Sequence, residues 1–340
     1  MRHLVILEYG YSLGIRSARV SVRYSGNVIK ELPLTRLKTI TVSTGGVSLS
    51  SDLIQACSIR GISIFFTDFK GEVISALMGA QQHAVVSIRK HQFRASEQIV
   101  VWAPIMTSVI IGKIKNQRSV LLYFAKYLRK KNALDELETL IGAQRSLSEC
   151  EERIRGCLVD LNVDTDGLSF RRSLMGHEGS AASIYWQALV KAGLMPSSFA
   201  RRLGHGAGDL GNQVLNYGYA ILGSTIWQAI HNAGLEAYCG FLHVDRPGKP
   251  SLVLDLMEEY RPWVVDRIVI ANRAFFDSKG EMRNEVKSRL ITQIKKSLGS
   301  RVVYGDRSRP RLDTVIQRQV YKFTAALIGG KPYKSYRFKW

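Results

Sequence analysis

The segment LHVDRPGKPSLVLDLMEEYRP, residues 242–262, concentrates acidic side chains that could bind a metal ion together. A Gly/Pro-rich turn opens the segment, and a helix is expected from Ser251, with Arg261 and Pro262 ending its regular pattern. Asp255 and Glu258 are three residues apart, so both carboxylates project from one face of that helix. Glu259 is four residues from Asp255 and could take the same place, a choice that spacing leaves open. Carboxylates this close repel one another, and in a cationic protein a bound cation is the usual compensation.

Two more side chains could complete such a site. His243 stands just before the turn, and Glu178 lies between Gly176 and Gly179 at the mouth of a predicted helix. One imidazole with two or three carboxylates makes a mostly oxygen site, which suits Mg²⁺ or Mn²⁺ better than Zn²⁺. Acids on a helix face and single histidines before turns are usually surface residues, so the prediction depends on their combination.

A divalent cation in this position would contact a phosphate oxygen and stabilise charge during in-line attack on a phosphodiester. Basic side chains near the same motifs would hold a nucleic-acid strand; they are Arg201, Arg202, Arg246, Lys249 and Arg261. Because Lys and Arg release counterions when they bind phosphates, salt should weaken this binding steeply.

The charge of the whole chain agrees with a polyanionic partner. Its 340 residues carry 48 Lys and Arg against 28 Asp and Glu, a net charge of +20. Nucleic acid is favoured over an anionic membrane surface, and a basic enzyme that merely stays soluble is the plainer alternative. Residues 301–340 hold ten Lys or Arg and two Asp among seven aromatic side chains that could stack on bases.

Membrane insertion and secretion are not expected. The longest apolar tract, residues 99–112, is interrupted by Pro104 and is shorter than the roughly 20 residues that a bilayer requires. The apolar run at the start is too short for a signal peptide. The four cysteines form no CxxC pair, so reduced thiols and a cytoplasmic protein are expected.

Hydrophobic periodicity predicts an α+β protein with two unequal domains. Residues 1–80 have the alternation of β-strands with one short helix, and they form the predicted dimerisation or partner domain. A polar, basic linker is expected at 81–94. Helical spacing then dominates 95–300, the predicted all-α catalytic domain, and 301–340 form a basic, aromatic C-terminal tail.

Three stretches identify a resemblance to a known family: GHEGSAASIYW at 176–186, DLGNQVLNYGYAIL at 209–222 and GFLHVDRPGKPSLVLDLMEEYRP at 240–262. Together with the β-rich start joined to a helical body, they resemble the CRISPR-associated metal-dependent endonuclease and integrase, the larger subunit of the spacer-acquisition complex. The resemblance spans essentially the whole chain.

The resemblance implies both a ligand set and a reaction. The family's metal ligands, a glutamate, a histidine and a helix-borne acid, match Glu178, His243 and Glu258, with Asp255 as an adjacent acid. Relatives act as homodimers with a small ferredoxin-like partner and bind double-stranded DNA with single-stranded ends. They insert these fragments into CRISPR repeat DNA by transesterification, as part of antiviral defence.

Two other functions remain open from the residues alone. In a non-catalytic nucleic-acid scaffold, the acids would only form salt bridges with Arg246 or Arg261. A generic metal-dependent phosphodiesterase acting on RNA or small nucleotides could use the same carboxylates.

Overall fold

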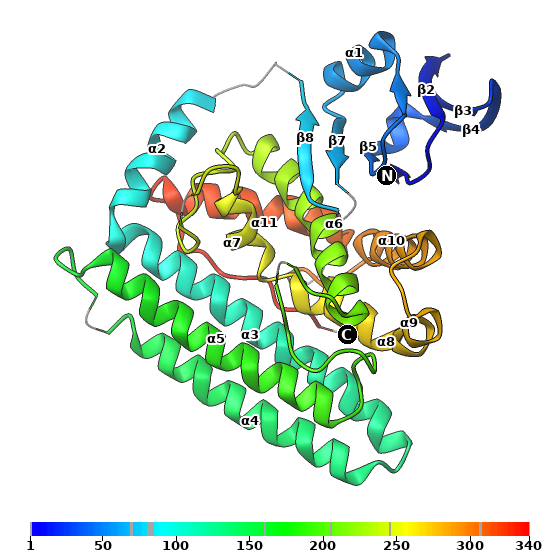
Figure 1. Ribbon diagram of the computed structural model, residues 1–340. Helices are drawn as coiled ribbons and strands as arrows, with labels where there is room; N and C mark the ends of the chain where they lie inside the picture. Colours follow the sequence, from blue (N-terminus) through cyan, green and yellow to red (C-terminus); the bar gives the residue numbers. More distant parts are fainter. Residues whose placement is uncertain are drawn as a thin grey trace.

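The computed structural model describes residues 2–68, 71–79, 85–159, 161–204, 206–244, 246–305 and 308–339. A β-rich N-terminal region is followed by a larger helical region, which confirms the predicted fold class (Figure 1).

The N-terminal region is built from two sheets. Its strands are β1 (Arg2–Ile6), β2 (Tyr11–Arg16), β3 (Arg19–Tyr24), β4 (Asn27–Pro33), β5 (Leu37–Val42), β6 (Ser48–Leu49), β7 (Ser63–Thr67) and β8 (Val73–Leu77). Within the described residues, one sheet has the order β1-β5-β7-β8, with β8 antiparallel and the others parallel. The other has the order β4-β3-β2-β6, antiparallel except for the β2–β6 pair.

The central parallel strands carry the core of this region. In β5, Leu37, Ile40 and Val42 are buried, because a strand paired on both sides offers branched apolar side chains to both faces of the sheet. The turn η1 (Leu34–Arg36) joins β4 to β5, and helix α1 (Ser51–Ile59) joins β6 to β7. The side chain of Ser50 caps α1 by accepting from the Leu53 N–H at 3.2 Å.

The helical region has a hydrophobic core of its own. Its elements are α2 (Val85–Glu97), α3 (Ile99–Lys130), α4 (Leu134–Gly156), α5 (Gly167–Lys191), α6 (Leu210–Asn232), α7 (Ser251–Met257), η2 (Pro262–Asp266), α8 (Arg267–Ala271), α9 (Arg273–Lys279), α10 (Asn284–Gly299) and α11 (Leu312–Leu327). Helices α3, α4 and α5 pack side by side, and α7 lies next to α6 (Figure 1).

Helix α3 is the central element of this region. Its length and composition would allow it to cross a membrane, but 72% of its most apolar window is buried inside the fold. It therefore packs as the core helix against which α4, α5, α7 and η2 are arranged. Pro104 lies inside α3 and does not end it. The apolar tract at 99–112, expected to be interrupted there, is therefore one unbroken part of this helix.

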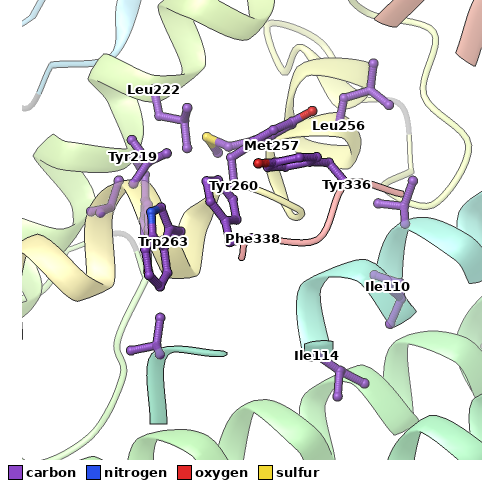
Figure 2. Close-up of a cluster of buried hydrophobic side chains, with 14 of the residues drawn as sticks. Ile110, Ile114, Tyr219, Leu222, Leu256, Met257, Tyr260, Trp263, Tyr336 and Phe338 are labelled. Carbon is purple, nitrogen blue, oxygen red and sulfur yellow. The ribbon is translucent and has the colours of Figure 1, made fainter. Parts of the chain in front are cut away.

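Two parts of the chain differ from the expected boundaries. Helix α2 covers 85–97 and so occupies most of the expected linker; residues 81–84 lie outside the described residues. In the expected tail, helix α11 is followed by a segment whose Tyr333, Tyr336 and Phe338 are buried in the core. Figure 2 shows Tyr336 and Phe338 with other buried side chains, and the Phe338 ring stacks on Trp263 with centroids 5.2 Å apart. These rings are therefore not available to stack on bases.

Candidate metal centre

Two of the predicted acids meet on one buried cation. Glu178 lies inside α5 and not at the mouth of a helix as expected, and Glu258 is the C-cap residue of α7. Between them stands Lys113 of α3, whose Nζ lies 2.6 Å from Glu258 Oε2 and also pairs with Glu178 Oε1. The side chain of Glu178 is 22% exposed, that of Glu258 is 4% exposed and that of Lys113 is 11% exposed. Long-range packing thus brings together carboxylates 80 residues apart in sequence.

Glu258 is the more deeply buried of these two acids. Burial acts to raise the pKa of its carboxyl, but Arg261 and Lys113 outweigh it and hold that pKa at about 2. Arg261 NH1 lies 3.1 Å from Glu258 Oε1, so each oxygen of the carboxylate faces a cation. His243 contributes in the same direction, because its imidazole lies near the carboxylate. Glu258 therefore remains ionised in the folded protein near neutral pH.

His243 is held by Asp255. Asp255 Oδ1 accepts from the backbone N–H of His243 at 3.0 Å and from its ring Nδ1 at 2.6 Å. Oδ2 accepts from the N–H groups of Phe241 and Leu242 at 2.7 and 3.1 Å. The fully buried carboxylate thus fixes both the loop and the imidazole, which leaves ring atom Nε2 for a ligand.

Gly240 permits this close approach of loop and helix. A Cβ atom at Gly240 would lie 2.9 Å from the backbone carbon of Ser251 and 3.0 Å from Asp255 Oδ2. The geometry therefore places Asp255 behind the histidine. Since both of its oxygens already accept two hydrogen bonds each, it is better suited to orient His243 than to bind an ion as the fourth predicted ligand.

Glu259 faces away from this cluster. Its carboxylate accepts from the hydroxyl of Tyr333 and, at 2.9 Å, from the backbone N–H of Tyr336, both in the C-terminal segment. Burial raises the pKa of Glu259 to about 7 despite these donors. Of the two acids that spacing could not separate, Glu258 is thus the one that contacts Lys113, the cation that also pairs with Glu178.

The donor set has the chemistry of a divalent-cation site. Two carboxylates and an imidazole whose Nε2 has no partner among the described residues suit Mg²⁺ or Mn²⁺. As placed, no three His, Cys, Asp or Glu side chains in the described part of the chain are close enough to enclose an ion. The ammonium of Lys113 lies between the two glutamates that would have to do so.

The predicted DNA-binding residues fall into two groups. Arg202 and Arg261 lie over the same Tyr219 ring, at 5.3 and 4.8 Å from its centroid, and Arg202 NH2 donates to Asn216 Oδ1 at 2.6 Å. They are thus ordered beside the acids. Arg201 and Arg246 are exposed, and Lys249 is half-buried in the turn that precedes α7.

The sequence did not point to two residues of this cluster. They are Lys113 and the buried acid Asp266, which lies near Arg261. Asp266 is buried, which raises its pKa to about 6, and its Oδ1 accepts from the Tyr219 hydroxyl at 2.6 Å. A signal for Lys113 was present, because it is a charged residue directly after the long apolar tract at 99–112. A buried charge of this kind requires an opposite charge beside it.

Known proteins match almost the whole of this chain in sequence. The family model described as "CRISPR associated protein Cas1" matches residues 4–297. The chain is 43% identical over its full length, and over the full length of the relative, to "CRISPR-associated endonuclease Cas1 1" of Francisella tularensis subsp. novicida (strain U112). It is 31% identical to a protein of the same name from Pyrobaculum aerophilum, covering 97% of this chain and 98% of the relative.

Solved structures share the fold at lower identity. A Cas1 protein from Thermotoga maritima superposes with a TM-score of 0.73 at 19% identity, covering 99% of this chain and all of that chain. The structure titled "Casposase bound to integration product" gives a TM-score of 0.72 at 21% identity, covering 98% of this chain and 93% of that chain. At these sequence identities, the similarity to the solved structures shows a shared fold only.

Proposed function

Because the chain belongs to the CRISPR associated protein Cas1 family, we propose that it is a metal-dependent DNA endonuclease and integrase of CRISPR adaptation. It inserts short foreign DNA fragments into the repeat array by phosphodiester transesterification. The observation that carries this proposal at the level of residues is the convergence of Glu178 and Glu258 on one cation beside a histidine held by Asp255.

The ligand assignment follows from how each side chain is held. Glu178, His243 and Glu258 would bind Mg²⁺ or Mn²⁺, and Asp255 would orient the imidazole through Nδ1. When bound, such an ion neutralises charge on the phosphate oxygens and on the attacking and leaving oxygens. Arg261 keeps Glu258 ionised and positioned, since it lies 3.1 Å from Glu258 Oε1.

DNA binding is assigned to the cationic side chains around this centre. Arg202 and Arg261 are pre-ordered over Tyr219, which reduces the side-chain entropy lost when they bind phosphates. Arg201, Arg246 and Lys249 supply further contacts. The substrate would be double-stranded DNA with single-stranded ends together with CRISPR repeat DNA.

The assembly is proposed from the family. A second copy of the chain would pair through the β-rich region, residues 1–80, and a small ferredoxin-like adaptation subunit would complete the complex. Support comes from a fold neighbour titled "Cas6-RT-Cas1--Cas2 complex". A reduced, cytoplasmic protein is consistent with the cysteines at Cys57, Cys150, Cys157 and Cys239, none of which forms a disulfide.

The test is cleavage and joining of branched, protospacer-like DNA with Mn²⁺. Glu178→Gln and His243→Ala should each lower both rates by at least about 10²-fold, because each removes a ligand that acts on the reacting phosphate. Glu285→Gln is the matched control, since this exposed acid pairs only with Lys279 at 3.0 Å among the contacts described. Unchanged cutting and joining in the first two variants would refute the site.

The same assay separates the alternatives. A non-catalytic scaffold would bind DNA equally well with and without EDTA, and neither the unaltered protein nor any variant would cut DNA. A generic phosphodiesterase would be inhibited equally by RNA and DNA competitors.

A further inference from the structure

Lys113 holds the carboxylate oxygens that a bound ion would need. Its Nζ contacts Glu178 Oε1 and lies 2.6 Å from Glu258 Oε2, on a side chain that is 11% exposed. An ion that took these oxygens as ligands would have to replace the ammonium. Lys113 cannot move far, because it projects from the middle of the core helix α3. The displaced charge would therefore stay beside the ion.

The net charge around Lys113 determines whether an ion can displace its ammonium without a further partner. Four carboxylates surround the site, those of Glu178, Glu258, Asp255 and Asp266, against three cations, Lys113, Arg261 and Arg202, which leaves one net negative charge. A divalent ion would convert this into one net positive charge in a largely buried site. Charge of either sign is costly where water is excluded, so one phosphodiester anion would restore balance.

We infer that Lys113 couples metal binding to DNA binding. The ammonium that the ion displaces takes a DNA phosphate as its new partner, so ion and DNA each increase the affinity of the other. The site can receive such a phosphate because the side chains of Glu178 and His243 remain 22% and 20% exposed. If the Lys113 ammonium were absent, the charges of the ion and of the surrounding side chains would already sum to zero, and no DNA phosphate would be needed to balance them. The inference deepens and rests on the proposed metal site.

The experiment measures Mn²⁺ affinity by electron paramagnetic resonance, without and with a duplex whose overhangs lack 3′-hydroxyls. In the unaltered protein, DNA should tighten Mn²⁺ binding by about tenfold or more, and Mn²⁺ should tighten DNA binding by the same factor. In Lys113→Met, Mn²⁺ should bind at least about tenfold more tightly without DNA, because a cation within a few ångströms is gone. DNA should then tighten Mn²⁺ binding by at least about threefold less than in the unaltered protein, because only the direct contact between ion and phosphate remains.

Two further variants test the role of charge. Lys115→Met is the matched control, because Lys115 lies on the same helix but its Nζ pairs with Glu151, 3.2 Å away. It should behave as the unaltered protein. Lys113→Gln repeats the test if Lys113→Met fails to fold, which a thermal melt detects. Lys113→Arg keeps the charge and should keep the coupling.

The outcomes are distinct. Equal Mn²⁺ affinities in the unaltered protein and the neutral Lys113 variants would overturn the inference, as would loss of coupling in Lys113→Arg. If Glu178→Gln and His243→Ala bind Mn²⁺ as the unaltered protein does, the metal site itself is wrong. That failure is seen without any Lys113 variant.

Discussion

Replacing Asp255 with asparagine should disrupt both the fold around the metal centre and the centre itself. The aspartate accepts four hydrogen bonds, two at each oxygen: from the Phe241 and Leu242 N–H groups at Oδ2, and from the His243 N–H and Nδ1 at Oδ1. Asparagine has the same shape but only one acceptor oxygen. Whichever way the amide turns, two of the four donors face its NH₂ group.

The loss can be put in numbers. A hydrogen bond to a charged group contributes roughly 1.5–3 kcal/mol, and two are lost, so the upper range is about 3–6 kcal/mol. Local relaxation of the 240–243 loop reduces this, and we expect the free energy of unfolding to fall by about 3 kcal/mol. Metal affinity should fall about 10–100-fold, because the imidazole loses its fixed orientation.

Urea unfolding followed by circular dichroism measures the first effect, and Mn²⁺ titration measures the second. Asp277→Asn is the matched control: its Oδ1 accepts from the Ser197 N–H and hydroxyl at 2.8 and 2.9 Å on the surface, and its stability should change by less than about 1 kcal/mol. If Asp255→Asn unfolds within about 1 kcal/mol of the unaltered protein, or binds Mn²⁺ equally well, the positioning role of Asp255 is wrong.

Three more outcomes are expected. Phe338→Ala should lower the free energy of unfolding by about 3–5 kcal/mol in a denaturation series, because it removes a buried ring stacked on Trp263; a loss under 1 kcal/mol would contradict core packing of the C-terminal segment. Burial lowers the pKa of His3 from 6.5 to about 4, so the unfolded chain binds its proton first and stability should fall, by at most about 3 kcal/mol, as pH drops from 6.5 to 4. In His3→Gln the free energy of unfolding should depend less on pH between 6.5 and 4, and at pH 8 it should equal that of the unaltered protein. An unchanged pH dependence in this variant would contradict the role of His3. Arg202→Ala should weaken DNA binding and reduce its salt dependence by about one phosphate contact in a fluorescence titration, whereas Arg283→Ala, at an exposed site, should leave the slope intact.

Much of the secondary structure around the site follows from local pattern. The helix expected from Ser251 begins at that residue, and the turn before it contains the expected glycine and proline. The predicted end at Arg261 and Pro262 is wrong: α7 already ends at Met257, and from Pro262 the chain continues as the π-helical turn η2 and then α8. Pro262 occupies the first position of η2, where its missing N–H costs little, so proline here begins a turn and does not end the helical path.

The C-terminal segment shows why composition alone misleads. Basic and aromatic residues alternate there, a pattern that suits both nucleic-acid binding and a half-buried extended chain. In the structure Tyr333, Tyr336 and Phe338 are buried while Lys334 and Arg337 between them are exposed. The spacing is that of an extended segment with one face on the core. Choosing between the two interpretations required knowing that α3 and η2 offer an apolar surface to cover.

The divergence of Glu258 and Glu259 could not be read from spacing, because it depends on which surfaces pack on each side of one turn. Successive residues of a helix point about 100° apart, so one acid faces α3 and α5 while its neighbour faces the C-terminal segment. Cations hold the pKa of Glu258 at about 2, whereas burial raises that of Glu259 to about 7. Asn116 links the two sides: its Nδ2 donates to the carbonyls of Glu259 and Tyr336 at 2.7 and 2.9 Å. The C-terminal segment therefore holds the back of the turn whose front presents Glu258, and the proposed metal centre depends on residues some 80 positions downstream of its own motif.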